Sequence, residues 1–167
     1  MNASLEAGDL LYRRKGLVQH AGVYIGNGQV LHNRPGGGVA IEDFQQFADN
    51  KPVKVVRVSR ENVDLLTERL HEILDKSAGY HLLANNCEHL AMLLIKGRQH
   101  SPQVRSVLLG MMSGALAGSR LRGKAWIFTA LAGGVGGLLF CNSTRKYDSI
   151  VLAAQSIEYQ AAHNTEY

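Results

Sequence analysis

The stretch from residue 107 to residue 141 limits most strongly what this chain can fold into, because it is apolar and interrupted by evenly spaced glycines. These glycines recur at intervals of four residues, at Gly110, Gly114 and Gly118 and again at Gly133 and Gly137. Residues four apart share one face of an α-helix, and small residues on such a face let two helix backbones approach closely. The sequence therefore predicts a glycine-rich helical hairpin over residues 101–148.

The second apolar run of this hairpin, residues 125–141, has 17 residues. As a helix it measures about 25 Å, which is at the lower limit for crossing a bilayer. Basic residues flank both runs and suit lipid headgroups: Arg120, Arg122, Lys124, Arg145 and Lys146. A shallow membrane hairpin, a reversibly binding helix pair and a soluble glycine-packed subdomain all remain open. We favour association with a membrane surface through residues 107–141.

The net charge of +4 is unevenly distributed along the chain. Residues 1–95 hold 10 Lys and Arg against 11 Asp and Glu, whereas residues 96–167 hold 8 against 3. The basic excess thus belongs to the more apolar part, where it favours an anionic membrane surface. Aromatic residues do not alternate with these basic residues, so we expect no nucleic-acid partner.

A chain of 167 residues is long enough for one full core, and we expect one compact domain with an appendage. We divide it into a domain at residues 1–100, the hairpin at 101–148 and a tail at 149–167, which is polar from residue 155 onward. The first residues lack an apolar signal segment, which predicts a cytoplasmic location. Cys87 and Cys141 lie far apart without metal-ligand spacing, so no disulfide, metal or cofactor is expected.

The first hundred residues alternate strand signals with helix signals, which predicts an α+β domain. Segments rich in β-branched and aromatic residues predict strands at residues 8–13, 19–25, 29–32, 39–42 and 53–58. Apolar residues at helical spacing predict an amphipathic helix over residues 62–76. A second helix, residues 86–96, is apolar nearly all round and should be buried against the sheet.

Cys87 stands in the first turn of this second helix, where Asn85 or Asn86 can cap the helix start. The helix dipole and the unpaired N–H groups there favour a thiolate over a thiol, which suits a nucleophile. A small buried residue at the start of a core helix is the alternative interpretation.

Two of the seven histidines, His20 and His32, lie on the two arms of one predicted hairpin. A two-residue turn at Asn27 and Gly28 would put them on opposite faces of the sheet. A three-residue loop, residues 26–28, with Gly28 in a bulge puts them on one face, with His32 opposite Gly22. We predict this bulged loop. The remaining histidines outside the cysteine segment, His71, His100 and His163, are interpreted as packed or surface residues.

Two segments together resemble the lecithin:retinol acyltransferase-like family, which includes small phospholipase A/acyltransferases. They are HAGVYIGNGQVLH, residues 20–32, and YHLLANNCEHL, residues 80–90. The family is related to NlpC/P60 thiol hydrolases in circularly permuted order, with histidine before cysteine, and this chain has that order. The resemblance covers roughly residues 8–97, and Leu90 stands where the family usually has an aromatic residue.

The resemblance implies a papain-like fold, with an antiparallel sheet packed on the cysteine-bearing helix. It implies that Cys87 is the nucleophile, His20 its general base and His32 the residue that orients His20. His89 belongs to the motif, and we interpret it as fixing the helix start. The implied activity is acyl transfer or hydrolysis on phospholipid or other acyl esters through a thioester on Cys87. A peptidase or amidase of NlpC/P60 type and a non-enzymatic, membrane-associated regulatory protein are the alternatives.

Overall fold

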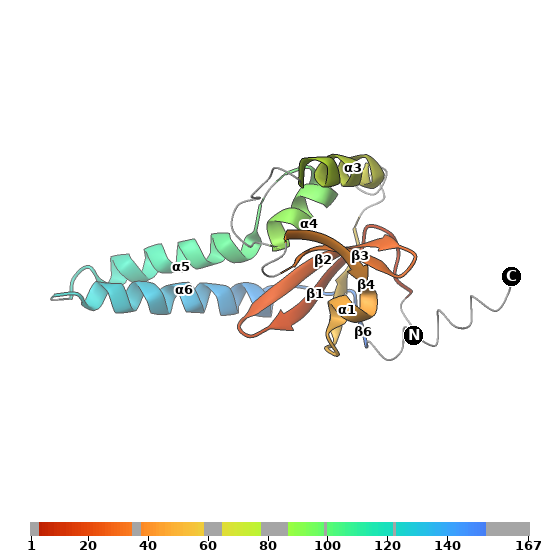
Figure 1. Cartoon of the computed structure of the whole chain (residues 1–167). Coiled ribbons are helices and arrows are strands. Elements are labelled where there is room, and N and C mark those ends of the chain that lie inside the picture. Colours follow the sequence, from red (N-terminus) through yellow and green to blue (C-terminus); the bar gives the residue numbers. More distant parts are fainter. Residues whose placement is uncertain are drawn as a thin grey trace, which may run out of the picture. The chain divides into compact units, whose positions relative to one another are not determined.

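The computed structural model describes residues 4–34, 38–58, 65–77, 87–98, 100–121 and 123–152. This part of the chain is α+β, with a six-stranded sheet in the order β4-β3-β2-β1-β5-β6 (Figure 1). The strands are β1 (Leu10–Lys15), β2 (Val18–Gly26), β3 (Gln29–Arg34), β4 (Gly38–Asp43), β5 (Val53–Val56) and β6 (Ser149–Val151). The described helices are α1 (Phe44–Ala48), α3 (Leu66–Ser77), α4 (Cys87–Lys96), α5 (Pro102–Gly118) and α6 (Ala125–Thr144).

The two faces of the sheet carry different helices. On one face, α3 and α4 pack against Leu10, Tyr12, Ala21, Val23 and Leu31 from the first three strands. On the other face, Phe44 and Phe47 of α1 pack against alternate strand residues, including Leu11 and Val30. Side chains alternate between the faces of a strand, so each strand contributes to both layers. The prediction of a sheet packed on the cysteine-bearing helix is thus confirmed, but α1 was not predicted.

The sheet continues past the strands that the sequence pattern indicated. β6 pairs antiparallel with β5, with Ile150 opposite Lys54. The first residues of the predicted tail, Ser149–Val151, thus belong to the sheet. Three residues are too short to show a period-two pattern, which is why this edge strand escaped detection.

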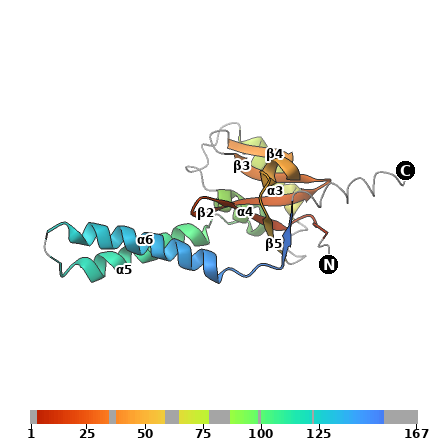
Figure 2. The same ribbon diagram turned by 90° about the horizontal axis from the view of Figure 1, so that it is seen from below.

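Helices α5 and α6 run side by side in both views of the molecule (Figures 1 and 2). They belong to a compact unit that comprises residues Ser101–Lys146 and the turn Lys15–Gln19, and the rest of the chain forms the other unit. Within this unit, Gln103 accepts a hydrogen bond from the backbone N–H of Gln19 at 3.0 Å and donates one to its carbonyl.

The contact between α5 and α6 is built on the glycines that the spacing singled out. An added Cβ at Gly110 would lie 2.1 Å from the carbonyl oxygen of Gly133, and one at Gly133 would lie 2.2 Å from that of Gly110. At Gly114 the nearest atom would be the carbonyl oxygen of Thr129, again at 2.1 Å. Real Cβ atoms cannot occupy these positions, so the two backbones pack this closely only because side chains are missing.

Both helices are longer than the apolar runs suggested. α5 starts at Pro102, where the Ser101 hydroxyl accepts a hydrogen bond from the Val104 N–H at 3.2 Å. This Ser-Pro pair is a helix-start signal that hydropathy alone does not register. α6 extends to Thr144, and the hydroxyls of Ser143 and Thr144 donate to the carbonyl of Phe140 within the last turn.

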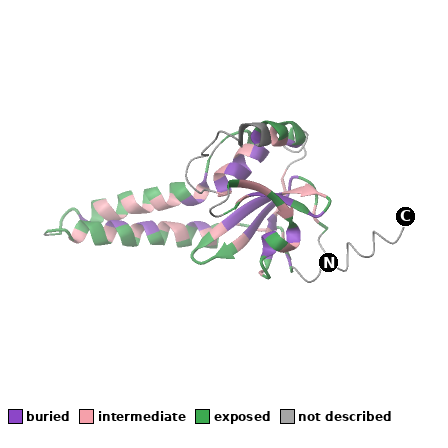
Figure 3. Ribbon diagram, viewed as in Figure 1, coloured by how far each residue is buried: buried purple, intermediate pink, exposed green. Residues whose placement is uncertain are grey.

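Large apolar side chains are exposed along both helices, whose surfaces are mostly exposed or intermediate in Figure 3. On α6 they are Trp126, Ile127, Phe128, Leu131, Val135, Leu139 and Phe140. With 20 residues, α6 is about 30 Å long and is long and apolar enough to cross a membrane by length and composition. The 17-residue run of the sequence pattern underestimated this length.

Replacing a glycine of α6 with alanine should destabilise the helix pair where the glycine faces α5 and should stabilise the helix where it faces away. Gly133→Ala should loosen the α5–α6 contact by about 1–3 kcal/mol, because its Cβ meets the backbone of Gly110. Gly136→Ala is the matched control, since nothing lies within 4 Å of its added Cβ. Alanine should stabilise the helix there by up to about 1 kcal/mol. Hydrogen exchange of the α5 and α6 amides measures both effects, and equal protection in the two variants would contradict this packing.

Candidate active site

The two hairpin histidines lie on one face of the sheet, because β2 and β3 pair with Gly22 opposite His32. This register confirms the same-face prediction, but its origin differs from the predicted one. The turn has two residues, Asn27 and Gly28, with φ values of 50° and 73°. The extra residue is Ile25, since the register shifts between Tyr24 and Gly26. A bulge inside β2, rather than a three-residue loop, therefore brings the histidines together.

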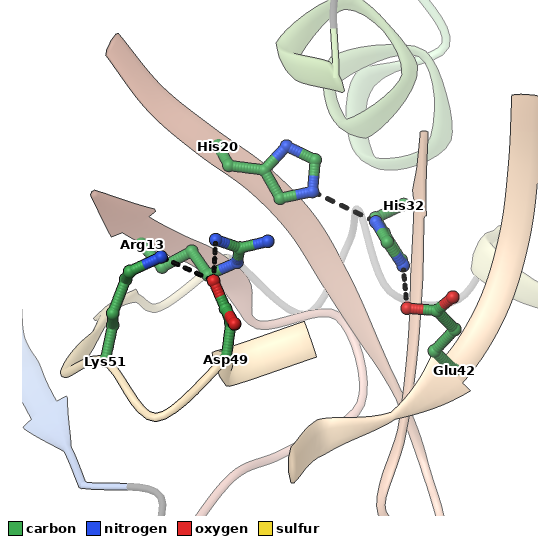
Figure 4. A network of polar contacts seen from close by, with 6 residues as sticks. All are labelled: Arg13, His20, His32, Glu42, Asp49 and Lys51. Atoms are coloured by element: carbon green, nitrogen blue, oxygen red, sulfur yellow. Dashed lines mark hydrogen bonds and ion pairs between the residues drawn. The ribbon is translucent and has the colours of Figure 1, made fainter. Parts of the chain in front are cut away.

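The two imidazole rings are directly hydrogen-bonded (Figure 4). His20 Nε2 lies 3.0 Å from His32 Nδ1, and both side chains are buried. On its far side, His32 Nε2 lies 2.9 Å from Glu42 Oε2 on β4. The Glu42 carboxylate in turn accepts from Arg34 Nε at 2.7 Å. The structure thus extends the predicted histidine pair into a four-residue polar chain across β2, β3 and β4.

Burial lowers the pKa of His32, and the hydrogen bond and charge of Glu42 only partly offset this effect. The pKa of Glu42 is also lowered: its partial desolvation acts to raise it, but the hydrogen bonds from Arg34 and His32 outweigh that. At neutral pH this hydrogen-bonded network therefore contains a neutral His32 beside an ionised Glu42 carboxylate.

The ring of Phe47, on α1, contacts both histidine rings, and the sequence pattern did not predict this contact. Its ring stacks on His20 with centroids 5.5 Å apart, and it meets His32 edge-on at 5.3 Å. A Cβ at Gly22 would lie 2.7 Å from both the Phe47 ring and Val30. The space left by Gly22 is therefore filled by Phe47, which fixes both rings. A fully buried aromatic residue in a five-residue helix gives no periodic signal that could have revealed it.

Cys87 is the first residue of α4, and it packs against the core cluster that α3 and α4 share with the sheet. Its Sγ accepts a hydrogen bond from the backbone N–H of Ala21 at 3.2 Å. Ala21 directly follows His20, and its side chain packs on the α4 side. The sulfur thus lies beside the β2 peptide that directly follows His20. The predicted cap by Asn85 or Asn86 lies outside the described residues.

The predicted preference of Cys87 for the thiolate is wrong for the site as it stands. Burial raises the pKa of the Cys87 thiol, and the neighbouring Glu88 charge adds to this effect. Hydrogen bonds from backbone amides, including that of Ala21, act in the opposite direction but do not outweigh burial. At neutral pH the sulfur carries its proton, so attack on a carbonyl requires a base that removes it.

The residues that follow Cys87 in the motif, Glu88, His89 and Leu90, are buried or half-buried in the core around α4. Glu88 is fully buried and accepts a hydrogen bond from the Tyr12 hydroxyl at 3.3 Å. Leu90 is buried in the same core, whereas His89 is half-buried. The proposed role of His89 at the helix start stays a prediction, because the residues before Cys87 are not described.

The structure describes two of the three histidines that were interpreted as packed or surface residues. His71 and His100 are exposed, and His163 lies outside the described residues. Within the described segments, no group of three or more His, Cys, Asp or Glu side chains could hold a metal ion. Cys141 is buried on α6, where Arg145 donates to its sulfur at 3.8 Å.

A comparison with protein families matches residues 3–100 to the family described as lecithin retinol acyltransferase. The match covers more than half of the chain and includes both histidines and Cys87, so the chain belongs to this family. The family is one of acyltransferases and phospholipases that act on lipid acyl esters. A search of curated proteins found no match.

Proposed function

We propose that this protein is a thiol-dependent acyltransferase and phospholipase A-type hydrolase that acts on lipid esters through an acyl thioester on Cys87. The observation that carries the proposal is the convergence at one peptide of β2. The Cys87 sulfur accepts the Ala21 N–H, and the adjacent His20 ring is hydrogen-bonded to His32. Nucleophile, base and orienting group in this order form a recurring arrangement for covalent acyl transfer.

In the first half of the reaction, His20 takes the proton from the Cys87 thiol as the sulfur attacks the ester carbonyl carbon. The carbonyl oxygen becomes an oxyanion, and we expect the backbone N–H of Cys87, in the first turn of α4, to donate to it. When the tetrahedral intermediate collapses, the ester C–O bond breaks and the leaving alcohol takes the proton from His20. The acyl group stays on Cys87 as a thioester.

In the second half, water or an acceptor amine or alcohol gives its proton to His20 and attacks the thioester carbonyl. The C–S bond breaks, and the Cys87 sulfur recovers the proton from His20. Water yields a free fatty acid, whereas an amine or alcohol yields an acylated acceptor. One site thus supports both hydrolysis and transfer, according to which nucleophile enters.

Membrane association through α5 and α6 belongs to the same proposal. The pair exposes large apolar side chains, α6 has the length of a bilayer core, and neither helix contains an acidic residue. Basic residues at both ends, among them Lys124 and Arg145, suit anionic headgroups. An esterase for phospholipids gains from this arrangement, because its substrate is concentrated in the membrane.

One experiment separates this function from its alternatives. The full chain is incubated with phosphatidylcholine vesicles and, in parallel, with a cell-wall peptide as the substrate of the peptidase alternative. We expect free fatty acid and lysophospholipid from the vesicles and an intact peptide. Peptide cleavage without lipid turnover would establish the peptidase alternative, and vesicle binding without any product would favour the non-enzymatic one.

A further inference from the structure

We propose that Glu42 is a positioning residue of the site: its carboxylate fixes the ring tautomers of His32 and, through it, of His20. The inference deepens the proposed function and rests on His20 acting as the base toward Cys87. The observation behind it is the unbroken chain of hydrogen bonds from Arg34 through Glu42 and His32 to His20. Figure 4 shows its part from Glu42 through His32 to His20.

The placement of Glu42 follows from the register of three neighbouring strands. β4 pairs with β3 so that Ala40 lies opposite His32 and Glu42 lies opposite Val30. Residues at even spacing share a sheet face, so Glu42 lies on the same face as His32 and diagonal to it. From there its Oε2 reaches His32 Nε2 at 2.9 Å, with only 15% of its side chain exposed.

The tautomers follow from donor and acceptor counting. An ionised carboxylate only accepts hydrogen bonds, so His32 Nε2 must carry the proton that it donates to Glu42. A neutral imidazole has one N–H, which leaves His32 Nδ1 as an acceptor. The ring nitrogen that faces it, His20 Nε2, must then be the donor. His20 Nδ1 is thereby the unprotonated nitrogen, the one that can take the thiol proton.

Arg34 keeps this arrangement stable against protonation of Glu42. It donates from Nε to Glu42 Oε1, and a second guanidinium nitrogen contacts the same oxygen. The charged groups that act on His32 are Glu42 from β4, Arg34 from β3 and Arg13 from β1, the last paired with Asp49. The two arginines lower the pKa of His32, so Glu42 is the one group among these that favours its protonated form.

The same carboxylate matters during the reaction. When His20 takes the thiol proton it becomes an imidazolium, whose charge lies next to the His32 ring. His32 donates from Nε2 to Glu42, which makes its Nδ1 a stronger acceptor toward that cation. The Glu42 charge thus stabilises the protonated base in the transition state without receiving a proton itself, as the aspartate of a catalytic triad does.

The test is Glu42→Gln in the full chain, with Glu68→Gln, an exposed carboxylate on α3, as the matched control. Glutamine keeps the shape of the side chain but loses the charge, and its NH2 group can favour the opposite tautomer of His32. We expect kcat for phospholipid hydrolysis to fall by about 10–100-fold in Glu42→Gln only. We also expect the acidic limb of its pH profile to move to lower pH, because the histidine pair loses the group that raises its pKa.

Nitrogen-15 NMR of the histidine rings decides between positioning and mere structural support. The wild type should show His20 and His32 protonated at Nε2, and Glu42→Gln should lose this single pattern. A lower rate with an unmoved acidic limb and unchanged ring shifts would overturn the proposal, as would an Nδ1-protonated His32 in the wild type. The ring shifts need no substrate, so they test Glu42 even if the chain does not act on phospholipid.

Discussion

Replacing Cys87 with alanine should reduce fatty-acid release from phosphatidylcholine vesicles by on the order of 10³-fold or more. In the proposed mechanism the Cys87 sulfur forms the acyl intermediate, and the alanine side chain has no atom that can replace it. Burial of the thiol raises its pKa, so the proposed reaction requires that a base remove the proton of Cys87.

Cys141→Ala is the matched control for this experiment, because it removes the other cysteine of the chain, on α6. Its activity should equal that of the wild type. Both variants are to be compared as folded proteins, with far-UV circular dichroism measured beside the release of fatty acid. Equal activity of Cys87→Ala and Cys141→Ala would remove Cys87 from the reaction.

Replacing Phe47 with alanine should lower the free energy of unfolding by about 3–5 kcal/mol, measured by urea titration. Phe47 is fully buried in one cluster with Val30 of β3 and with Val53 and Val55 of β5. The Phe47 ring also contacts both histidine rings, so without it these rings should no longer be held in one orientation relative to each other.

Phe44→Ala separates these two effects. Phe44 is buried in the same cluster, so its truncation should cost a similar amount of stability. The ring contacts to His20 and His32 come from Phe47, and only Phe47→Ala should therefore lower kcat under conditions where the protein is folded. If both variants lose activity in proportion to stability, the aromatic ring beneath the histidines has no role in the site.

Much of this site could be predicted from the sequence, because its parts are local patterns. A hairpin signal with two histidines and a cysteine at a helix start are each readable within a dozen residues. The register was predicted correctly for a reason that proved wrong, since the extra residue is Ile25 in β2 rather than a third turn residue. A bulge depends on how the whole strand pairs, and a single hairpin sequence does not specify it.

The residues that the sequence did not reveal act across the sheet. Glu42 reaches His32 only through the pairing of β3 with β4, and Phe47 reaches both rings only because α1 folds under that face. The position of Cys87 at a helix start predicts a lowered pKa, and that position can be recognised in the local sequence. Burial raises the pKa instead, and it depends on how the whole core packs. Tertiary contacts therefore revealed the supporting residues, while local sequence patterns revealed the residues that we propose to react.

The most direct test of the account is the intact mass of the protein quenched in acid during turnover of phosphatidylcholine vesicles. The proposed thioester mechanism predicts a mass increase of one acyl chain, located on the peptide that contains Cys87. Neutral hydroxylamine should remove this adduct, as expected for a thioester. An acyl adduct that persists in Cys87→Ala, or lipid turnover by that variant at the wild-type rate, would contradict it.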